Sequence, residues 1–277
     1  MDSLKKKELI KKAADVRIGI IEGVHAAKSG HPGGSLSIAD ILTYLYFDYL
    51  NIDPEDPKNE NRDRFVLSKG HAAPALYSVL ANRGYFDVSE LKTLRHIGSF
   101  LQGHPDMKHI PGVDMSSGSL GQGISAACGM ALSAKHFKND FKVFTVLGDG
   151  ELEEGQVWEA AMFAGNKGLD NLTAFIDLNN LQIDGTIDEV NSAKPVDKKF
   201  EAFNWHTITI DGHDFEQIEA ALKEAETVNK PVAIIANTIK GKGVSFMENQ
   251  VSWHGSAPND EQYEIAMNEL KAYKAAL

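Results

Sequence analysis

The stretch Val143-Phe-Thr-Val-Leu-Gly-Asp-Gly150 decides the fold, because its apolar run ends in a Gly-Asp-Gly turn. A helical pattern follows over residues 156–165, and a second apolar run, residues 172–178, ends in Asn179-Asn180. Asp149 and Asn179 are about 30 residues apart, the length expected for a strand, a helix and a parallel return strand. We therefore predict two neighbouring parallel strands whose polar ends lie at one edge of a sheet, where open α/β sheets bind ligands.

Strands and helices alternate on both sides of this unit. Short apolar runs at residues 64–68, 206–210 and 232–236 are typical of strands. The residue patterns predict helices over residues 9–24, 37–45, 72–80, 121–135 and 214–228. The alternation predicts an α/β protein with a mostly parallel sheet flanked by helices on both faces. Because no linker or repeat interrupts the pattern, we expect residues 1–277 to form a single domain.

Local patterns predict the position of some further side chains. Ser37 and Asp40 are spaced as a capping box at the start of a helix. His213 follows an Asp-Gly turn and precedes the start of a helix, and this local structure explains a histidine there without a role in function.

Two helices carry residues that we expect in the core. Trp158, Met162 and Phe163 lie at helical spacing, which is typical of a buried helix face. Cys128 lies in an Ala-rich helix and is expected to be a small buried apolar group.

The composition excludes several classes of protein. The 277 residues include 28 basic and 39 acidic side chains, a net charge of −11, which disfavours a nucleic-acid partner. Hydrophobic residues make up 43%, as in globular proteins, and residues 1–12 lack the apolar core of a signal peptide. With one cysteine, no internal disulfide and no stretch that reads as a membrane span, we expect a cytoplasmic protein.

The polar strand ends have the chemistry of a magnesium site. Asp149 offers a carboxylate, Asn179 an amide oxygen, and the region of Leu181 a main-chain carbonyl. Mg²⁺ prefers such oxygen ligands and accepts few protein carboxylates when a phosphate supplies the others. Gly150 leaves its amide open to a phosphate oxygen at the start of the next helix.

Several segments together resemble the transketolase family. Gly148-Asp-Gly-Glu-Leu-Glu-Glu-Gly155 followed by Asn179 is similar to the family's thiamine diphosphate motif. The other segments that agree, in the family's order, are Ser29-Gly-His-Pro-Gly33, Lys69-Gly-His71, Gly103-His-Pro105, Gly118-Ser-Leu-Gly-Gln-Gly123 and Ser252-Trp-His-Gly255. The resemblance covers the family's amino-terminal, diphosphate-binding domain and implies a thiamine diphosphate-binding fold.

The resemblance implies a set of site residues. Asp149, Asn179 and the Leu181 carbonyl would hold Mg²⁺, with Ca²⁺ or Mn²⁺ as substitutes. The residues implied to contact thiamine diphosphate are His71, Gly118, Ser119, Leu120, Gly150, Asn179, Lys240 and His254. Those implied in catalysis are His31, His71, His104 and His254, which would hydrogen-bond the sugar and move protons, and Glu154, which resembles a glutamate at the family's subunit interface.

The resemblance also implies an activity and a partner. Transketolases of the pentose phosphate pathway transfer a two-carbon ketol unit from a ketose phosphate to an aldose phosphate. In this family a glutamate of a pyrimidine-binding domain starts activation of the cofactor, and residues 1–277 contain neither that domain nor the carboxyl-terminal one. We therefore expect a separate subunit that carries both, an α2β2 heterotetramer, and activity only in the complex.

The residue patterns also agree with other functions. One is another thiamine diphosphate enzyme, such as a deoxyxylulose-phosphate synthase or the α-subunit of a 2-oxoacid dehydrogenase. A second is a non-catalytic domain that regulates a partner. The segment Gly121-Gln-Gly123-Ile-Ser-Ala126 also fits the loose fingerprint of nicotinamide dehydrogenases, but that fingerprint needs a strand directly before it.

Overall fold

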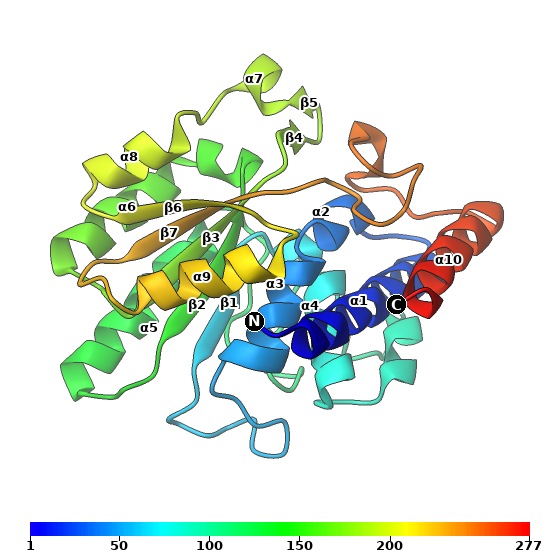
Figure 1. Cartoon of the computed structure of the whole chain (residues 1–277), viewed down its shortest axis with the longest axis horizontal. Coiled ribbons are helices and arrows are strands. Elements are labelled where there is room, and N and C mark those ends of the chain that lie inside the picture. The colour runs from blue at the N-terminus through cyan, green and yellow to red at the C-terminus, as the bar shows by residue number, and fades with distance from the viewer.

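The computed structural model describes residues 1–277, and its centre is a sheet of five parallel strands in the order β1-β2-β3-β7-β6 (Figure 1). The strands are β1 Arg64–Leu67, β2 Val143–Gly148, β3 Leu172–Leu178, β6 His206–Asp211 and β7 Val232–Asn237. Two short strands, β4 Leu181–Gln182 and β5 Gly185–Thr186, pair separately as an antiparallel ribbon. The predicted parallel sheet is confirmed.

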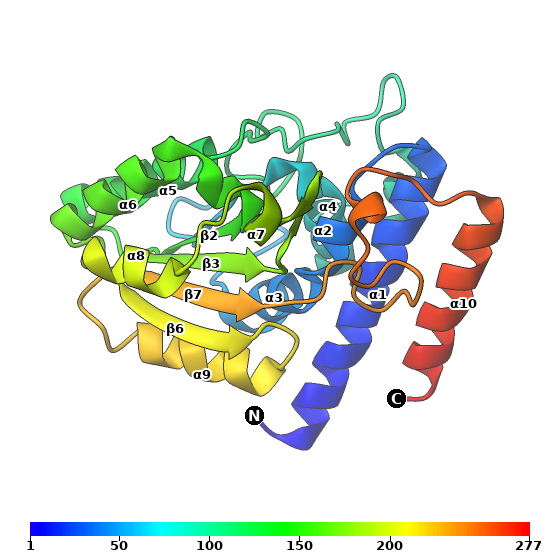
Figure 2. The same ribbon diagram turned by 90° about the horizontal axis from the view of Figure 1, so that it is seen from above.

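The sheet is buried on both faces. Along β2, Phe144 and Val146 belong to one core cluster, whereas Val143 and Leu147 belong to the other. Successive side chains of a strand point to opposite faces, so each face has its own apolar layer. Helices α5 (Gln122–Phe137) and α6 (Gly155–Lys167) cover one face, and α9 (Phe215–Ala225) covers the other (Figure 2).

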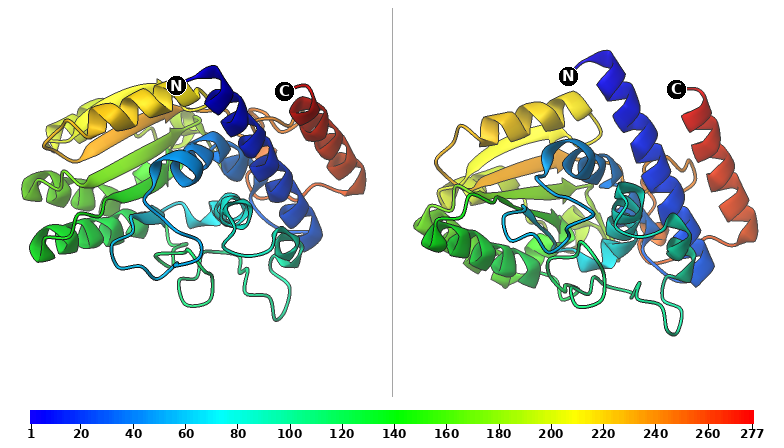
Figure 3. Two further views of the ribbon diagram at one scale, coloured as in Figure 1. Left: turned by 60° about the horizontal axis from the view of Figure 1, so that its bottom comes forward. Right: turned by 90° about the horizontal axis from the view of Figure 1, so that it is seen from below.

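The remaining helices pack mainly beside the carboxyl edge of the sheet. The long helix α1 (Ser3–Ala27) lies side by side with α10 (Asp260–Ala275), so the two chain ends lie on the same side of the molecule (Figure 3). No helix combines the length and the apolar character needed to cross a bilayer. The other helical elements are α2 Pro32–Leu36, α3 Ala39–Tyr44, η1 Leu45–Tyr49, η2 Gly70–Ala72, α4 Ala73–Arg83, η3 Val88–Thr93, η4 Gly150–Glu153, α7 Ile187–Val190, α8 Val196–Ala202 and η5 Val251–Trp253.

The predicted capping box of Ser37 and Asp40 is wrong. The Ser37 hydroxyl donates to the Asp177 carboxylate at 2.7 Å, and the Asp40 carboxylate binds Arg17 and His213. The chain is already helical from Pro32 to Leu36, before α3 begins. Tertiary partners therefore take both side chains away from the local cap.

The predicted core positions of α6 are also partly wrong. Met162 is 55% exposed and Phe163 is 38% exposed, although Trp158 packs against the core. Helical spacing gives a common face but does not say which face the sheet covers. Cys128, in contrast, is buried in α5 as predicted, and burial raises the pKa of its thiol to about 12.

Candidate active site at the carboxyl edge of the sheet

The polar ends of the strands meet at one cavity of about 240 Å³. Gly148 of β2 pairs with Asp177 of β3, and Leu178 of β3 pairs with Asn237 of β7, so the segments after these strands emerge next to each other. The predicted site residues that line the cavity are His71, Leu120, Asp149, Gly150, Asn179, Leu181, Lys240 and His254. Side chains from segments far apart in the sequence thus share one pocket.

Asp149 is buried directly after β2, and both of its carboxylate oxygens accept backbone hydrogen bonds. Oδ1 accepts from the N–H of Gly150 at 2.9 Å, and Oδ2 accepts from the N–H of Asn180 at 2.5 Å. Burial, followed by the nearby charge of Asp177, raises the pKa of Asp149 to about 7. The negative charge of this carboxylate is incompletely compensated, so a cation beside it would be stabilised.

The floor of the cavity is a buried ion pair that the sequence patterns did not reveal. The Lys69 ammonium donates to Oδ2 of Asp177 and to the Gly34 carbonyl, both at 2.6 Å. Asp177 also accepts from Ser37, Thr238 and the Asn179 amide. Burial alone would raise the pKa of Asp177, but the charge and hydrogen bond of Lys69 hold it below its usual range. The one sign of this ion pair in the sequence is Asp177, a carboxylate inside the mostly apolar strand β3.

Asn179 and Leu181 are arranged by this floor. The Asn179 Nδ2 donates to Asp177 at 3.0 Å, which fixes the amide so that Oδ1 is its acceptor end. Oδ1 accepts the N–H of Leu181 at 3.1 Å, and the Leu181 carbonyl accepts from the Lys240 ammonium at 3.0 Å. An ammonium therefore already contacts one of the oxygens that we expect to bind a metal ion.

Three histidines form a cluster beside the cavity. The ring centroids of His31 and His71 are 5.2 Å apart, those of His71 and His254 are 5.2 Å apart, and those of His31 and His254 are 5.6 Å apart. Burial first, and then nearby positive groups, lower the pKa of His31 to about 4 and that of His254 to about 3. Burial and the Lys69 charge also lower the pKa of His71. All three imidazoles are neutral at pH 7.

The hydrogen bonds of these rings show which ring nitrogens have a partner in the chain and which do not. Nδ1 of His254 lies 2.9 Å from the Lys240 ammonium, which can only donate, so the proton of this neutral ring is on Nε2. Nδ1 of His31 is buried without any hydrogen-bond partner. Buried polar atoms are rarely left unpaired, so this nitrogen is an exception that calls for an explanation.

Two glycines permit the close approach of backbone segments here. A Cβ at Gly33 would lie 2.8 Å from the Trp253 carbonyl oxygen and 3.0 Å from Cγ of Lys240. Gly118 has φ +149° and would place a Cβ 3.0 Å from the ring of His104. The loops that carry His104, Lys240 and His254 can therefore converge only around residues without side chains.

Some predicted site residues lie outside the cavity. His31 packs on its histidine neighbours, and His104 is exposed against Gly118. Ser119 and Glu154 are exposed, and the Glu154 carboxylate has no hydrogen-bond or ion-pair partner in this chain. Gly118 also lies outside the cavity and is half-buried, whereas Leu120 lines the cavity and is 36% exposed. This side of the site is open.

Glu151 is a further residue that sequence reasoning missed. Its carboxylate is buried and accepts from the Ser68 hydroxyl at 2.5 Å, the Gly121 N–H at 2.9 Å and the Gly148 N–H at 3.0 Å. It joins the ends of β1 and β2 to the start of α5. Burial raises its pKa despite these bonds.

The residues present fit a divalent cation together with a phosphate group. No cluster of three or more His, Cys, Asp or Glu side chains is arranged to hold a metal ion by itself. A cation would therefore rely on Asp149, the Asn179 amide and the Leu181 carbonyl, and would need further oxygens from a ligand. Lys240 suits the charge of a phosphate. The Gly150 N–H, which we expected to be open to a phosphate oxygen, instead donates to Oδ1 of Asp149 in this structure, so that expectation is wrong.

The fold and this cavity define an α/β ligand-binding domain with places for a cation and an anion at the carboxyl edge of its sheet. Residues 8–273 match the family described as "Transketolase, thiamine diphosphate binding domain". The chain belongs to this family, and the resemblance stated above is confirmed.

Individual relatives extend this result. The chain is 49% identical, over 87% of its length and 88% of the relative's, to the 6-deoxy-6-sulfo-D-fructose transketolase subunit SqwG of Clostridium sp. (strain MSTE9). It is 44% identical, over 91% of its length and 89% of the relative's, to an apulose-4-phosphate transketolase subunit of Phocaeicola vulgatus. The transketolase structure of Campylobacter jejuni matches with a TM-score of 0.90 at 35% identity, covering 98% of this chain and 43% of that one.

Proposed function

We propose that this chain is the amino-terminal subunit of a two-chain transketolase, active only with a partner subunit. The observation that carries the proposal is the shared cavity of Asp149, Asn179, Leu181, Lys240 and His254. Two relatives named as transketolase subunits align with almost the whole chain, which supports the division into two polypeptides.

The residues of the cavity divide into two groups around thiamine diphosphate. Asp149, Asn179 and the Leu181 carbonyl would hold Mg²⁺, in agreement with the incompletely compensated carboxylate and the ammonium already bound to Leu181. The residues proposed to contact the cofactor are His71, Gly118, Ser119, Leu120, Gly150, Asn179, Lys240 and His254. When bound, thiamine diphosphate supplies the nucleophilic carbon and the electron sink for ketol transfer.

The histidines would bind the sugar and move its protons. His31, His71 and His254 are neutral, so each ring can donate from one nitrogen and accept at the other. Nδ1 of His31 has no partner in this chain, and the Nε2–H of His254 is a free donor. His104, on the open side, would join them at the hydroxyl groups of the substrate.

The proposed assembly with a partner subunit is based on the solvent-exposed side of the site. Residues 1–277 would form one diphosphate-binding domain, and a partner subunit would supply the pyrimidine-binding and carboxyl-terminal domains in an α2β2 heterotetramer. The exposed Leu120 and Glu154 lie where such a partner would complete the site. We propose a cytoplasmic enzyme that acts on sugar phosphates and binds neither nucleic acid nor membranes, in keeping with the net charge of −11.

Reconstitution tests the proposal. The purified chain is mixed with the polypeptide that carries the two other domains, and ketol transfer is followed with ketose phosphates, apulose 4-phosphate and 6-deoxy-6-sulfo-D-fructose as donors. We expect negligible turnover by either chain alone and transfer by the mixture. Substantial turnover by this chain alone would refute the division of the site.

A single substitution distinguishes the proposed enzyme subunit from a non-catalytic regulatory domain. Asp149→Asn should abolish Mg²⁺-dependent binding of thiamine diphosphate to the assembled protein, because it removes the carboxylate ligand. Asp188→Asn, at an exposed aspartate paired with Lys194, is the matched control and should bind normally. Isothermal calorimetry that finds no metal-dependent binding in the unmodified assembly would favour a non-catalytic domain.

A further inference from the structure

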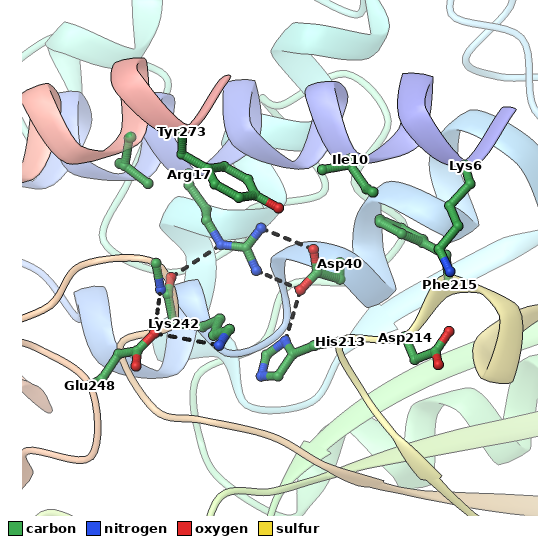
Figure 4. Close-up of a pocket in the computed structure, with 12 residues that line it drawn as sticks. Lys6, Ile10, Arg17, Asp40, His213, Asp214, Phe215, Lys242, Glu248 and Tyr273 are labelled. Atoms are coloured by element: carbon green, nitrogen blue, oxygen red, sulfur yellow. Dashed lines mark hydrogen bonds and ion pairs between the residues drawn. The ribbon is translucent and has the colours of Figure 1, made fainter. Parts of the chain in front are cut away.

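A second cavity, of about 480 Å³, lies behind the loop that carries Lys240. Its lining comes from α1, α3, α10, the turn between β6 and α9, and the loop after β7 (Figure 4). Lys242 and Gly243 line this cavity, whereas Lys240 lines the first cavity, which holds Asp149 and Asn179; because we propose that it binds the diphosphate, we call it the diphosphate cavity. The loop after β7 is therefore a wall between the two cavities.

A chain of hydrogen bonds crosses this second cavity. The Arg17 guanidinium donates twice to the Asp40 carboxylate, at 2.9 and 2.5 Å, and Oδ2 of Asp40 lies 2.8 Å from Nδ1 of His213 (Figure 4). Nε2 of His213 accepts the backbone N–H of Ile239 at 2.9 Å. Because a backbone N–H can only donate, the proton of the neutral ring must be on Nδ1, where it faces Asp40.

The network holds the backbone on both sides of Lys240. His213 binds the N–H of Ile239, and Nε of Arg17 donates to the Lys242 carbonyl at 3.1 Å. Between these two points, the Lys240 side chain extends into the diphosphate cavity, where it is 2% exposed. Its ammonium contacts the Leu181 carbonyl and Nδ1 of His254 at 3.0 and 2.9 Å. The position of this charge thus depends on how the loop is held from behind.

We propose that His213, oriented by Asp40 and Arg17, is a positioning residue that fixes Lys240 for binding the diphosphate. The proposal rests on the function proposed above, and it gives His213 a role beyond the turn and helix start that explain it locally. His213 touches neither the cofactor nor the substrate; it acts through the N–H of Ile239. The buried Arg17–Asp40 pair keeps the ring in the one tautomer that can accept this bond.

The test compares four variants in the assembled enzyme by calorimetry with thiamine diphosphate and Mg²⁺. His213→Phe removes the acceptor and should raise the dissociation constant of the cofactor about tenfold, because ordering the released loop on binding then costs part of the binding free energy. His213→Gln keeps an acceptor at the position of Nε2 and should recover most of the affinity. In Lys240→Met, the further change His213→Phe should cost no additional affinity, because the residue through which it acts is gone.

Matched controls and a second readout make the outcome decisive. His206→Phe removes another histidine–carboxylate pair, with Glu224, on the neighbouring strand and should leave cofactor affinity unchanged. At saturating cofactor, His213→Phe should change kcat little. On the chain alone, reductive methylation of Lys240, followed by mass spectrometry, should be faster in His213→Phe than in the unmodified chain or in His206→Phe.

Specific results would overturn the inference. Equal losses from His213→Phe with and without Lys240 would show that His213 does not act through that lysine. Unchanged methylation of Lys240 in His213→Phe would show that the loop is held by other contacts. An unmodified assembly that binds no thiamine diphosphate would instead refute the proposed function, while the methylation result would still decide the role of His213.

Discussion

Lys240 has a central place among the charged residues of the diphosphate cavity. Its own pKa is lowered to about 8, chiefly by burial, and its charge helps to lower the pKa of His254 to about 3. The same site holds Asp149, whose pKa is raised to about 7 by burial and by Asp177. Such shifts of opposite sign within one pocket are typical of sites that bind ions and move protons.

The histidines give a pH prediction at the scale of single residues. Because burial lowers the pKa of His31 to about 4 and of His254 to about 3, both rings should remain neutral at pH 6, where an ordinary imidazole is mostly protonated. Nitrogen chemical shifts of the labelled chain, recorded by NMR between pH 8 and pH 5, measure this directly. Titration of either ring near pH 6.5 would contradict the prediction.

Single residues also show what the sequence could predict. Asp149 and Asn179 were identified because each follows a recognisable strand, and parallel strands end at a common edge. Lys69 and Asp177 were missed because their bond joins residues 108 positions apart, and nothing local to either one signals the other. Glu151 was missed for the same reason, since its partners belong to three separate segments.

At the scale of elements, the contact between α5 and β1 depends on one glycine. A Cβ at Gly123 would lie 2.5 Å from Cα of Ser68, so the helix can approach the strand end only without a side chain there. Gly129 lies in the same helix, and a Cβ there would have no atom within 4 Å. The two positions form a matched pair.

Alanine substitutions should separate these positions. Gly123→Ala should lower the free energy of unfolding of the chain by about 1–3 kcal/mol, because the helix must shift away from β1. Gly129→Ala should raise it by up to about 1 kcal/mol, because alanine has the higher helix propensity and meets no obstacle. Urea unfolding of the two variants measures both changes, and a loss of stability in Gly129→Ala would contradict the stated contacts.

The sequence predicted which helices and strands exist better than it predicted which face of a helix is buried or at which residue an element ends. The helix predicted to Val228 ends at Ala225, and the polar pattern of Ser37 and Asp40 did not reveal their distant partners. Met162 and Phe163 were assigned to the core because helical spacing places them on one face with Trp158, but the spacing does not show whether that face packs against the sheet or is exposed to solvent. Tertiary packing decides such points, and a local pattern does not contain it.

On the scale of the whole molecule, one side of the site is left to solvent. The class of fold followed from alternating strands and helices, but the order β1-β2-β3-β7-β6 did not, because it depends on pairing between distant segments. Leu120 lines the cavity and is 36% exposed, and Glu154 is exposed nearby without a partner in this chain. Both observations agree with a site that another polypeptide completes.

Glu154 therefore gives a prediction about assembly. Glu154→Ala should leave the melting temperature of the isolated chain unchanged, because the carboxylate makes no bond there. It should lower ketol transfer by the reconstituted complex at least tenfold, about 1.4 kcal/mol in barrier height. Glu55→Ala, at an exposed loop residue, serves as the control and should change neither quantity. Full activity of the Glu154→Ala complex would place this residue outside the functional interface.

The lone thiol of the chain, enclosed between α5 and α6 with Sγ 3.7 Å from the Ala160 carbonyl oxygen, has a practical consequence. Alkylating dyes react with thiolates. Because burial raises the pKa of the Cys128 thiol to about 12, we expect it not to react with them. A cysteine introduced at the surface would then be the single labelled atom in the molecule. Fluorescence from such a label could report the arrival of a second polypeptide in real time, without any background from the native sulfur.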